Sequence, residues 1–267
     1  MFTIFGNTGF IGKELKKYLL KKKYKVFTPK KKEIIFKKNL GKIIYCIGRD
    51  DWKNKPFENF YANLGLLIKI LNNNKFSSIC FLSSTRVYKY NKRNLTNEEA
   101  NITVNPNNED HFYNLLKICA ESFLVSNFRK KSKIIRLSNV VGINPKSPLI
   151  LPTMIKHALK NKKFNFYISP NSKKDFIHID EVLPMIEKII NSGKKNLYNL
   201  ASGQNIKIKE IVDALGKYKK LRYRVIKNKI INEPKINIKQ IQKEFNYKSN
   251  KKTFKDMQAL IKGFKKK

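Results

Sequence analysis

Apolar residues in this chain gather in two kinds of segment, which alternate along most of its length. Short apolar runs predict buried strands, and longer segments with apolar residues three or four positions apart predict helices. The predicted strands are Phe2–Phe5, Lys25–Phe27, Ile43–Ile47, Ser78–Ser83, Lys133–Leu137, Phe164–Ile168 and Leu197–Leu200. The predicted helices are the segment with Leu15, Leu19 and Leu20, then Asn59–Leu71, Tyr113–Phe128, Leu149–Lys160, Asp180–Asn191 and Ile208–Leu215.

This alternation predicts an α/β protein with a parallel, doubly wound sheet. At 267 residues, the chain has room for one such unit and a smaller attached part. The stretch between Phe27 and Ile43 is short for a full strand–helix unit, so we expect an abbreviated sheet there. The tail 250–267 keeps a helical apolar pattern. The sequence lacks a run of about 18 uncharged apolar residues, which argues against membrane insertion.

Three glycines, Gly6, Gly9 and Gly12, follow the first predicted strand and precede a helix. Glycines at such a turn let the backbone bend sharply and approach a pyrophosphate, whose charge then lies at the helix N-terminus. Their G-x-x-G-x-x-G spacing differs from the general G-x-G-x-x-G fingerprint, and glycines also mark ordinary turns. The position directly after the first strand favours a dinucleotide site.

The net charge of +39 raises the alternative of a non-catalytic nucleic-acid-binding protein. Only seven of the 58 basic residues are arginine, and the lysines are spread along the whole chain. Proteins that read nucleic acid tend to cluster arginine with aromatic residues, so spread lysine favours a solvated surface. We therefore expect no specific nucleic-acid partner, although weak, salt-sensitive binding would follow from the charge.

Cysteine and histidine do not indicate a metal site. Cys46, Cys80 and Cys119 lie in apolar segments without metal-ligand spacing, which is typical of buried free thiols in a cytoplasmic protein. The three histidines are scattered.

The strongest candidate for acid/base chemistry is Tyr113 with Lys117. They are four residues apart on a predicted helix and share one face. A lysine cation beside a phenol lowers the pKa of the phenol and makes it a usable acid/base. The chain holds five Tyr-x-x-x-Lys pairs, so spacing alone is weak evidence. Position selects Tyr113, because it follows a strand that ends near Ser84, whose hydroxyl can polarise a reacting carbonyl.

These residues resemble the extended short-chain dehydrogenases/reductases, the NAD-dependent epimerase/dehydratase family that acts on nucleotide sugars. The resemblance extends to about residue 215 and implies a Rossmann-type fold. Its markers are Gly6-Asn7-Thr8-Gly9-Phe10-Ile11-Gly12 for the cofactor turn, Asn63 near the nicotinamide, and Ser84 in Leu82-Ser83-Ser84-Thr85-Arg86-Val87-Tyr88. Further along, Arg136-Leu137-Ser138-Asn139-Val140-Val141-Gly142 resembles the family's strand whose asparagine, here Asn139, meets the substrate. Lys174-Asp175-Phe176-Ile177-His178-Ile179-Asp180 resembles the family's segment whose basic residue, here Lys174, binds the substrate pyrophosphate.

The resemblance implies a role for each marker. Ser84, Tyr113 and Lys117 would be catalytic, and Tyr113 and Lys117 would also contact the cofactor. Cofactor binding would further involve the glycine turn, Asn63 and the stretch Cys46-Ile47-Gly48. The substrate would contact Ser84, Thr85, Arg86, Asn139 and Lys174.

Two departures from the family concern the cofactor. Where NAD users place an acid for the ribose hydroxyls, this chain has Lys30 and Lys31, which can pair with a 2′-phosphate. The lysines favour NADP(H), with NAD(H) possible because lysine is so common in this chain. The family's His-x-Ala-Ala after the next strand is replaced by Tyr45-Cys46-Ile47-Gly48.

Other departures concern the reaction. Sugar 4,6-dehydratases of the family carry Asp-Glu where this chain has Thr85-Arg86, so dehydration lacks its acid and base. The Cys and His of fucose-synthase-type epimerisation are matched by Arg86 and Leu149. Ser-Tyr-Lys alone suits 4-keto reduction of a nucleotide-diphosphate sugar, with a 4-epimerase that keeps NAD bound as the alternative.

The resemblance also predicts how the chain is organised. Residues 1–142 and 177–205 would form the dinucleotide-binding part, and residues 143–176 and 206–267 a smaller substrate-binding part. The helices Asn59–Leu71 and Tyr113–Phe128 carry enough apolar surface for a four-helix contact, which predicts a homodimer.

Overall fold

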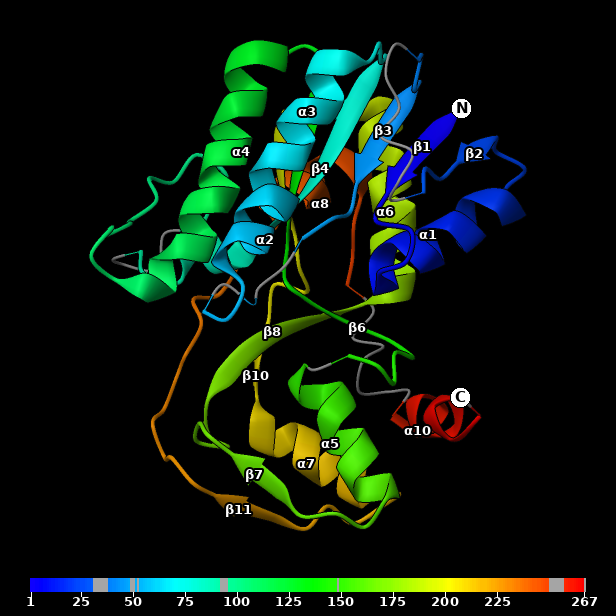
Figure 1. Ribbon diagram of the computed structural model, residues 1–267. Coiled ribbons are helices and arrows are strands. Elements are labelled where there is room, and N and C mark those ends of the chain that lie inside the picture. The colour runs from blue at the N-terminus through cyan, green and yellow to red at the C-terminus, as the bar shows by residue number, and fades with distance from the viewer. Residues whose placement is uncertain are drawn as a thin grey trace.

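Figure 1 shows the computed structural model, which describes residues 1–30, 38–48, 51, 53–91, 96–147, 149–249 and 257–266. Its central sheet has six parallel strands in the order β2-β1-β3-β4-β5-β9. The strands are β1 (Phe2–Phe5), β2 (Val26–Phe27), β3 (Lys42–Tyr45), β4 (Ser78–Ser84), β5 (Ser132–Leu137) and β9 (Leu197–Leu200). The predicted α/β fold with a parallel sheet is therefore confirmed.

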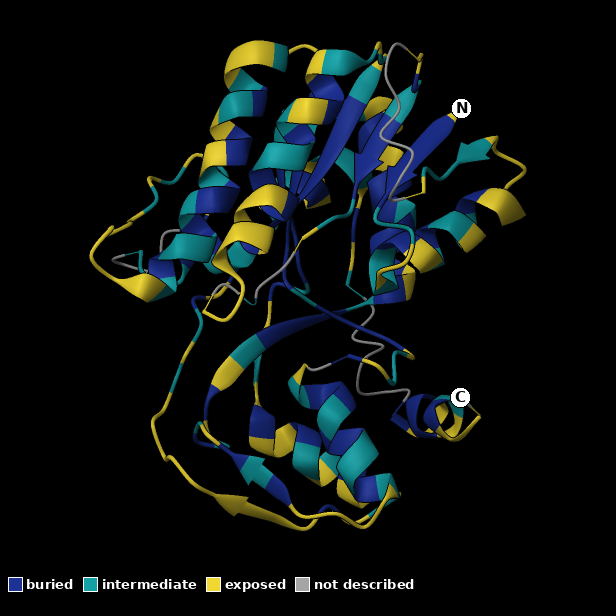
Figure 2. Cartoon of the chain, in the orientation of Figure 1, coloured by how far each residue is buried: buried dark blue, intermediate teal, exposed yellow. Residues whose placement is uncertain are grey.

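Helices cover both faces of this sheet (Figure 1). Helices α1 (Phe10–Lys21) and α6 (Ile179–Ser192) lie on one face, while α3 (Leu66–Asn73) and α4 (Phe112–Phe128) lie on the other. Each layer buries its own hydrophobic cluster against the sheet, as Figure 2 shows by the dark inner sides of the helices. Burial on both faces explains why all four residues of β1 are buried, including Thr3, whose hydroxyl donates to the backbone oxygen of Leu40.

The strand order reverses beside β1. The chain leaves β1 for β2 on one side and returns to β3 on the other, so Phe2 pairs with both Val26 and Lys42. In open α/β sheets, the crevice beyond the carboxyl ends of the strands at such a reversal is where ligands bind. The glycine turn follows β1 at this point, and Cys46-Ile47-Gly48 follows β3.

Two further sheets lie beyond the carboxyl ends of these strands (Figure 1). A three-stranded sheet comprises β10 (Asn205–Lys207), β8 (Lys173–His178) and β6 (Asn139–Val141), and a two-stranded sheet comprises β11 (Tyr223–Val225) and β7 (Phe164–Phe166). Helices α5 (Ile150–Leu159), α7 (Ile208–Gly216) and α10 (Met257–Lys265) share a hydrophobic cluster with them.

The division of the chain into two parts stays a prediction. Helix α8 (Lys239–Phe245) packs against β9, and its Ile241 joins the cluster of the six-stranded sheet together with Tyr247. The sequence assigned both residues to the smaller part. Among the described residues, no helix is long and apolar enough to cross a membrane.

The predicted helix Asn59–Leu71 differs in detail from the structure. It begins at Pro56 as α2 (Pro56–Phe60) and passes through a π-helical turn, η1 (Tyr61–Gly65), before α3. Within this turn Asn63 is buried, and its amide donates to the backbone and side-chain oxygens of Asn59 at 3.0 and 2.9 Å. Such turns are frequent at functional sites. Two 3-10 turns, η2 (Thr85–Tyr88) and η4 (Glu109–His111), precede α4.

Candidate active site

A cleft of about 610 Å³ opens at the carboxyl ends of the central strands. It brings together most of the residues singled out from the sequence. These are Gly9, Phe10, Ile11, Cys46, Ile47, Gly48, Ser84, Thr85, Arg86, Tyr113, Lys117, Asn139 and Lys174. Segments that are far apart in the chain thus converge at the reversal of strand order, where the fold places a ligand.

The glycine turn has the close backbone contacts that its sequence predicts. Gly6 has a φ of +89°, and a Cβ there would lie 2.9 Å from the carbonyl carbon of Cys46. A Cβ on Gly12 would overlap the carbonyl oxygen of Gly6, so α1 can begin this close to β1 only without a side chain. Gly9 is the N-cap residue of α1 and has no side chain that could cap this helix end. The turn therefore fits a pyrophosphate, which could accept from the first N–H groups of α1.

Lys117 is buried beneath the cleft on α4. Its Nζ donates to the backbone oxygen of Leu82 at 3.1 Å. Burial lowers the pKa of Lys117 to about 8, because removal from water disfavours the charged form. A side chain on Gly48 would begin 3.3 Å from Nζ of Lys117 and 3.5 Å from Oδ1 of Asn63. The absence of a side chain at Gly48 thus lets the loop after β3 pass close to both polar groups.

Tyr113 lies one helical turn before Lys117, half-buried at the wall of the cleft. The Nζ of Lys117 is 5.8 Å from the centre of its ring, and the Arg86 guanidinium carbon is 5.5 Å from it. Ser84, at the end of β4, accepts a hydrogen bond from the Arg86 N–H at 3.2 Å. The hydroxyl proton of Ser84 is then available for an oxygen in the cleft.

Asn139 and Lys174 contact a residue that the sequence analysis did not single out. The Nζ of Lys174 lies 2.5 Å from a carboxylate oxygen of Glu233, and the Asn139 amide donates to the other oxygen at 3.3 Å. Glu233 also lines the cleft, as do Lys89 and Asp175. Glu233 lies in a segment without a recognisable motif, so no sequence signal could have identified it.

Other predicted residues lie beside the cleft or elsewhere. The described residues that line the cleft do not include Gly6, Asn7, Thr8, Gly12 or Asn63, although the glycine turn and Asn63 adjoin it. Lys30 is exposed after β2 and does not line the cleft either, and Lys31 lies outside the described residues.

The expectation of three buried thiols is wrong for Cys119. Cys80 is buried and Cys46 is half-buried at the cleft, but Cys119 is exposed on α4. The apolar pattern of this helix extends around to its outer face, so the pattern could not show which side is buried.

Comparisons with known proteins identify the family and the fold of the chain. The model of the NAD dependent epimerase/dehydratase family matches residues 2–201. A search of curated proteins by sequence gives no match.

Solved structures share the fold at low sequence identity. RMD from Pseudomonas aeruginosa, complexed with NADPH, has a TM-score of 0.82 at 16% identity, with 99% of each chain covered. A mutant UDP-glucuronic acid 4-epimerase from Bacillus cereus, with a fluorinated UDP-glucuronic acid and NAD, gives the same values. A dTDP-glucose 4,6-dehydratase from Bacillus anthracis in complex with NAD has a TM-score of 0.76 at 17% identity, covering 99% of this chain and 96% of that one.

Proposed function

This chain belongs to the NAD dependent epimerase/dehydratase family, and we propose from this premise that it reduces the 4-keto group of a nucleotide-diphosphate sugar. The observation that supports the proposal is the convergence of Ser84, Tyr113 and Lys117 at a cleft bordered by the glycine turn. The nicotinamide cofactor, when bound, supplies or accepts the hydride.

Residues of this chain would transfer the proton and stabilise the negative charge that develops. Ser84 donates its hydroxyl hydrogen to the sugar oxygen and polarises the carbonyl. Tyr113 gives its phenolic proton to the same oxygen as the carbon is reduced. Lys117, charged below a pH of about 8, stabilises the negative charge that Tyr113 then carries.

The residues beside Ser84 favour simple hydride transfer over dehydration. Thr85 and Arg86 line the cleft at this point, and neither can act as a carboxylate acid or base. Leu149, which also lines the cleft, cannot shuttle a proton from carbon either. Ketone reduction needs only the Ser-Tyr-Lys groups, but so does the oxidation and return of hydride in a 4-epimerase.

The remaining predicted residues indicate how the substrate diphosphate and the cofactor would be bound. Asn139 and Lys174 would anchor the diphosphate, for which Lys174 would exchange Glu233 for a phosphate oxygen. NADPH is the proposed reductant because Lys30 and Lys31 stand where an acid would hold the ribose of NAD. The relatives of this fold are complexed with either cofactor, as the NADPH and NAD complexes above illustrate.

The stoichiometry of NADPH oxidation tests the proposed reduction. Purified protein is incubated with NADPH and a panel of 4-keto nucleotide sugars, and we expect one NADPH oxidised per product formed. Tyr113→Phe should bind NADPH and the nucleotide normally but lose most turnover, by roughly 100-fold or more. Protein that carries tightly bound NAD and interconverts two sugars without net oxidation would instead show a 4-epimerase. Near-normal turnover of Tyr113→Phe would remove this residue from the mechanism.

A further inference from the structure

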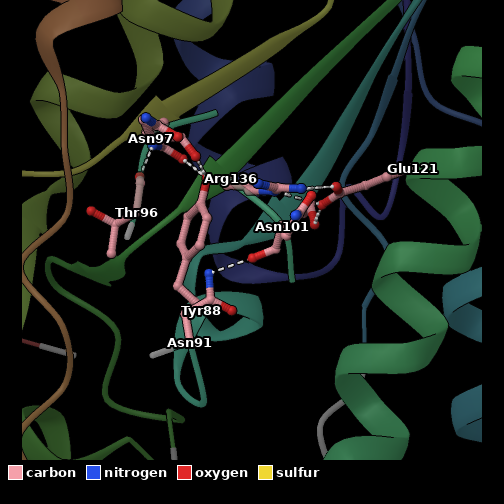
Figure 3. Close-up of polar contacts among 9 residues, drawn as sticks. Tyr88, Asn91, Thr96, Asn97, Asn101, Glu121 and Arg136 are labelled. Atoms are coloured by element: carbon pink, nitrogen blue, oxygen red, sulfur yellow. Dashed lines mark hydrogen bonds and ion pairs between the residues drawn. The ribbon is translucent and has the colours of Figure 1, made fainter. Parts of the chain in front are cut away.

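A buried ionic cluster of Glu121, Arg136 and Tyr88 (Figure 3) includes a residue one helical turn after Lys117 on α4. Glu121 of α4 accepts three hydrogen bonds from the Arg136 guanidinium of β5, the shortest at 2.6 Å. Both side chains are over nine-tenths buried. Arg136 also donates to the Tyr88 hydroxyl at 2.6 Å, and Tyr88 donates to the Asn199 side chain at 2.9 Å. The cluster therefore ties α4, β5, η2 and β9 together.

The same cluster fixes α4 against the end of β4. Three consecutive residues there make different contacts. The Leu82 backbone oxygen accepts a hydrogen bond from Lys117, the Ser83 hydroxyl donates to Glu121 at 2.5 Å, and Ser84 lines the cleft. Lys117 and Glu121 are one helical turn apart on one face of α4. A slip of α4 along β4 would break both contacts and move Tyr113 away from Ser84.

A buried ion pair such as Glu121–Arg136 is weak evidence of a purely stabilising role. Burying two charges costs several kcal/mol per ion, and a hydrophobic pair of similar volume is often as stable. A second buried carboxylate, Glu187 of α6, accepts from Lys22 at 2.6 Å and from the hydroxyls of Tyr18 and Tyr24. Its carboxylate is as buried as that of Glu121, but its lysine partner is half-exposed and it does not line the cleft, so it serves as a reference for the loss of a buried carboxylate.

We propose that Glu121 is a positioning residue for catalysis, which acts through Ser83 and Lys117 to align Tyr113 with Ser84. The inference rests on the proposed function and extends it to a residue that contacts neither substrate nor cofactor. Arg136 holds the Glu121 carboxylate in place, and Tyr88 orients Arg136.

The negative charge of Glu121 changes the pKa of Lys117 in a predictable direction. Burial lowers the pKa of Lys117, and the neighbouring Glu121 carboxylate raises it again. Among the described residues, the titratable and charged groups around Lys117 are Glu121 and Tyr113 of α4 and Cys46 after β3, with Arg136 of β5 paired to Glu121. The Leu82 carbonyl of β4 accepts its hydrogen bond. Removing the carboxylate while Arg136 remains charged must lower the pKa of Lys117 below about 8.

The test measures NADPH binding by fluorescence between pH 6 and 10, with turnover measured alongside. Wild-type affinity should fall as Lys117 loses its proton, with a midpoint near pH 8. Glu121→Gln should move this midpoint down by about one pH unit and lower kcat about tenfold or more, with little change in the KM for NADPH at pH 6. Ser83→Ala keeps the charge, so it should lower kcat without moving the midpoint.

Glu187→Gln is the control, because it removes a buried, hydrogen-bonded carboxylate that does not line the cleft. It should lower the melting temperature and leave the midpoint and kcat unchanged. An unmoved midpoint in Glu121→Gln, or an unchanged kcat in Ser83→Ala, would overturn the role of Glu121 while the proposed function stands. Ser83→Ala keeps the inference testable if Glu121→Gln does not fold. Wild-type protein that binds neither NADPH nor NADH at any pH would overturn the proposed function and this inference together.

Discussion

At the scale of residues, a group needed for the proposed reaction can lower the free energy of unfolding, and Lys117 is the clearest case. Its pKa of about 8 in the folded protein lies below its ordinary value of 10.5, so folding buries a charge at neutral pH. Lys117→Met should therefore abolish turnover and yet raise the free energy of unfolding at pH 7 by about 1–2 kcal/mol, after the lost bond to Leu82 is allowed for.

The pH dependence of this gain follows from the two pKa values of Lys117. Between about 8 and 10.5 the unfolded chain binds more protons than the folded one, so the stability of the wild type rises with pH in this window. The advantage of Lys117→Met should shrink over the same range and vanish above it. Urea unfolding of both proteins at pH 7 and pH 10 measures this, and an advantage that persists at pH 10 would contradict the assignment.

The preference for NADPH over NADH is predicted from a single residue, Lys30. Lys30 can pair with the 2′-phosphate of NADPH, whereas Asp at this position would accept hydrogen bonds from the ribose hydroxyls of NADH. We expect wild-type protein to bind NADPH about tenfold more tightly than NADH, and Lys30→Asp to level or reverse the ratio. Fluorescence titration with both cofactors measures it. A wild type that prefers NADH would show that Lys30 is only surface charge.

At the scale of elements, the turn between β1 and α1 makes the sharpest prediction. A Cβ on Gly12 would overlap the Gly6 carbonyl oxygen and lie 3.1 Å from the Cα of Asn7, and backbone atoms cannot yield as a flexible side chain would. Gly12→Ala should weaken cofactor binding at least tenfold and cost about 1–3 kcal/mol of stability. Gly216→Ala at the end of α7 is the control, because a Cβ there meets nothing within 4 Å. A Gly12→Ala protein with normal cofactor affinity would mean that the turn does not hold the pyrophosphate.

The helices and strands also show which parts of the fold could be predicted from the sequence. Buried strands such as β1 and β4, and helices such as α4 and α7, carry strong apolar patterns, and the structure has them where the sequence predicts them. Strand β11 is exposed at all three positions, and α8 buries only Ile241, so neither has a pattern to detect. The π-helical turn at Asn63 includes a side-chain hydrogen bond to Asn59, which spacing does not show. Glu233 reaches Lys174 across 59 residues, and only the folded chain brings them together.

At the scale of the whole molecule, the outer side of the α2–α4 layer predicts self-association. Phe57, Phe60 and Tyr61 are 86%, 48% and 44% exposed, and Cys119 is exposed on the neighbouring α4. Exposed apolar side chains gathered on one layer are typical of an interface, and a twofold axis would pair this layer with its copy as four helices. We therefore expect a homodimer in light scattering at micromolar concentration.

Replacing Phe60 and Tyr61 together by Asp should shift this dimer toward monomer, because the two charges would face each other across the axis without partners. The matched control is Leu20→Asp on α1, which is 49% exposed on the opposite side of the sheet and should leave the dimer intact. Because Tyr61 and Asn63 share the turn that packs beside α4, the monomer should also bind cofactor less tightly. A wild type that is monomeric at micromolar concentration, or a dimer lost equally in Leu20→Asp, would show that this layer is not the interface.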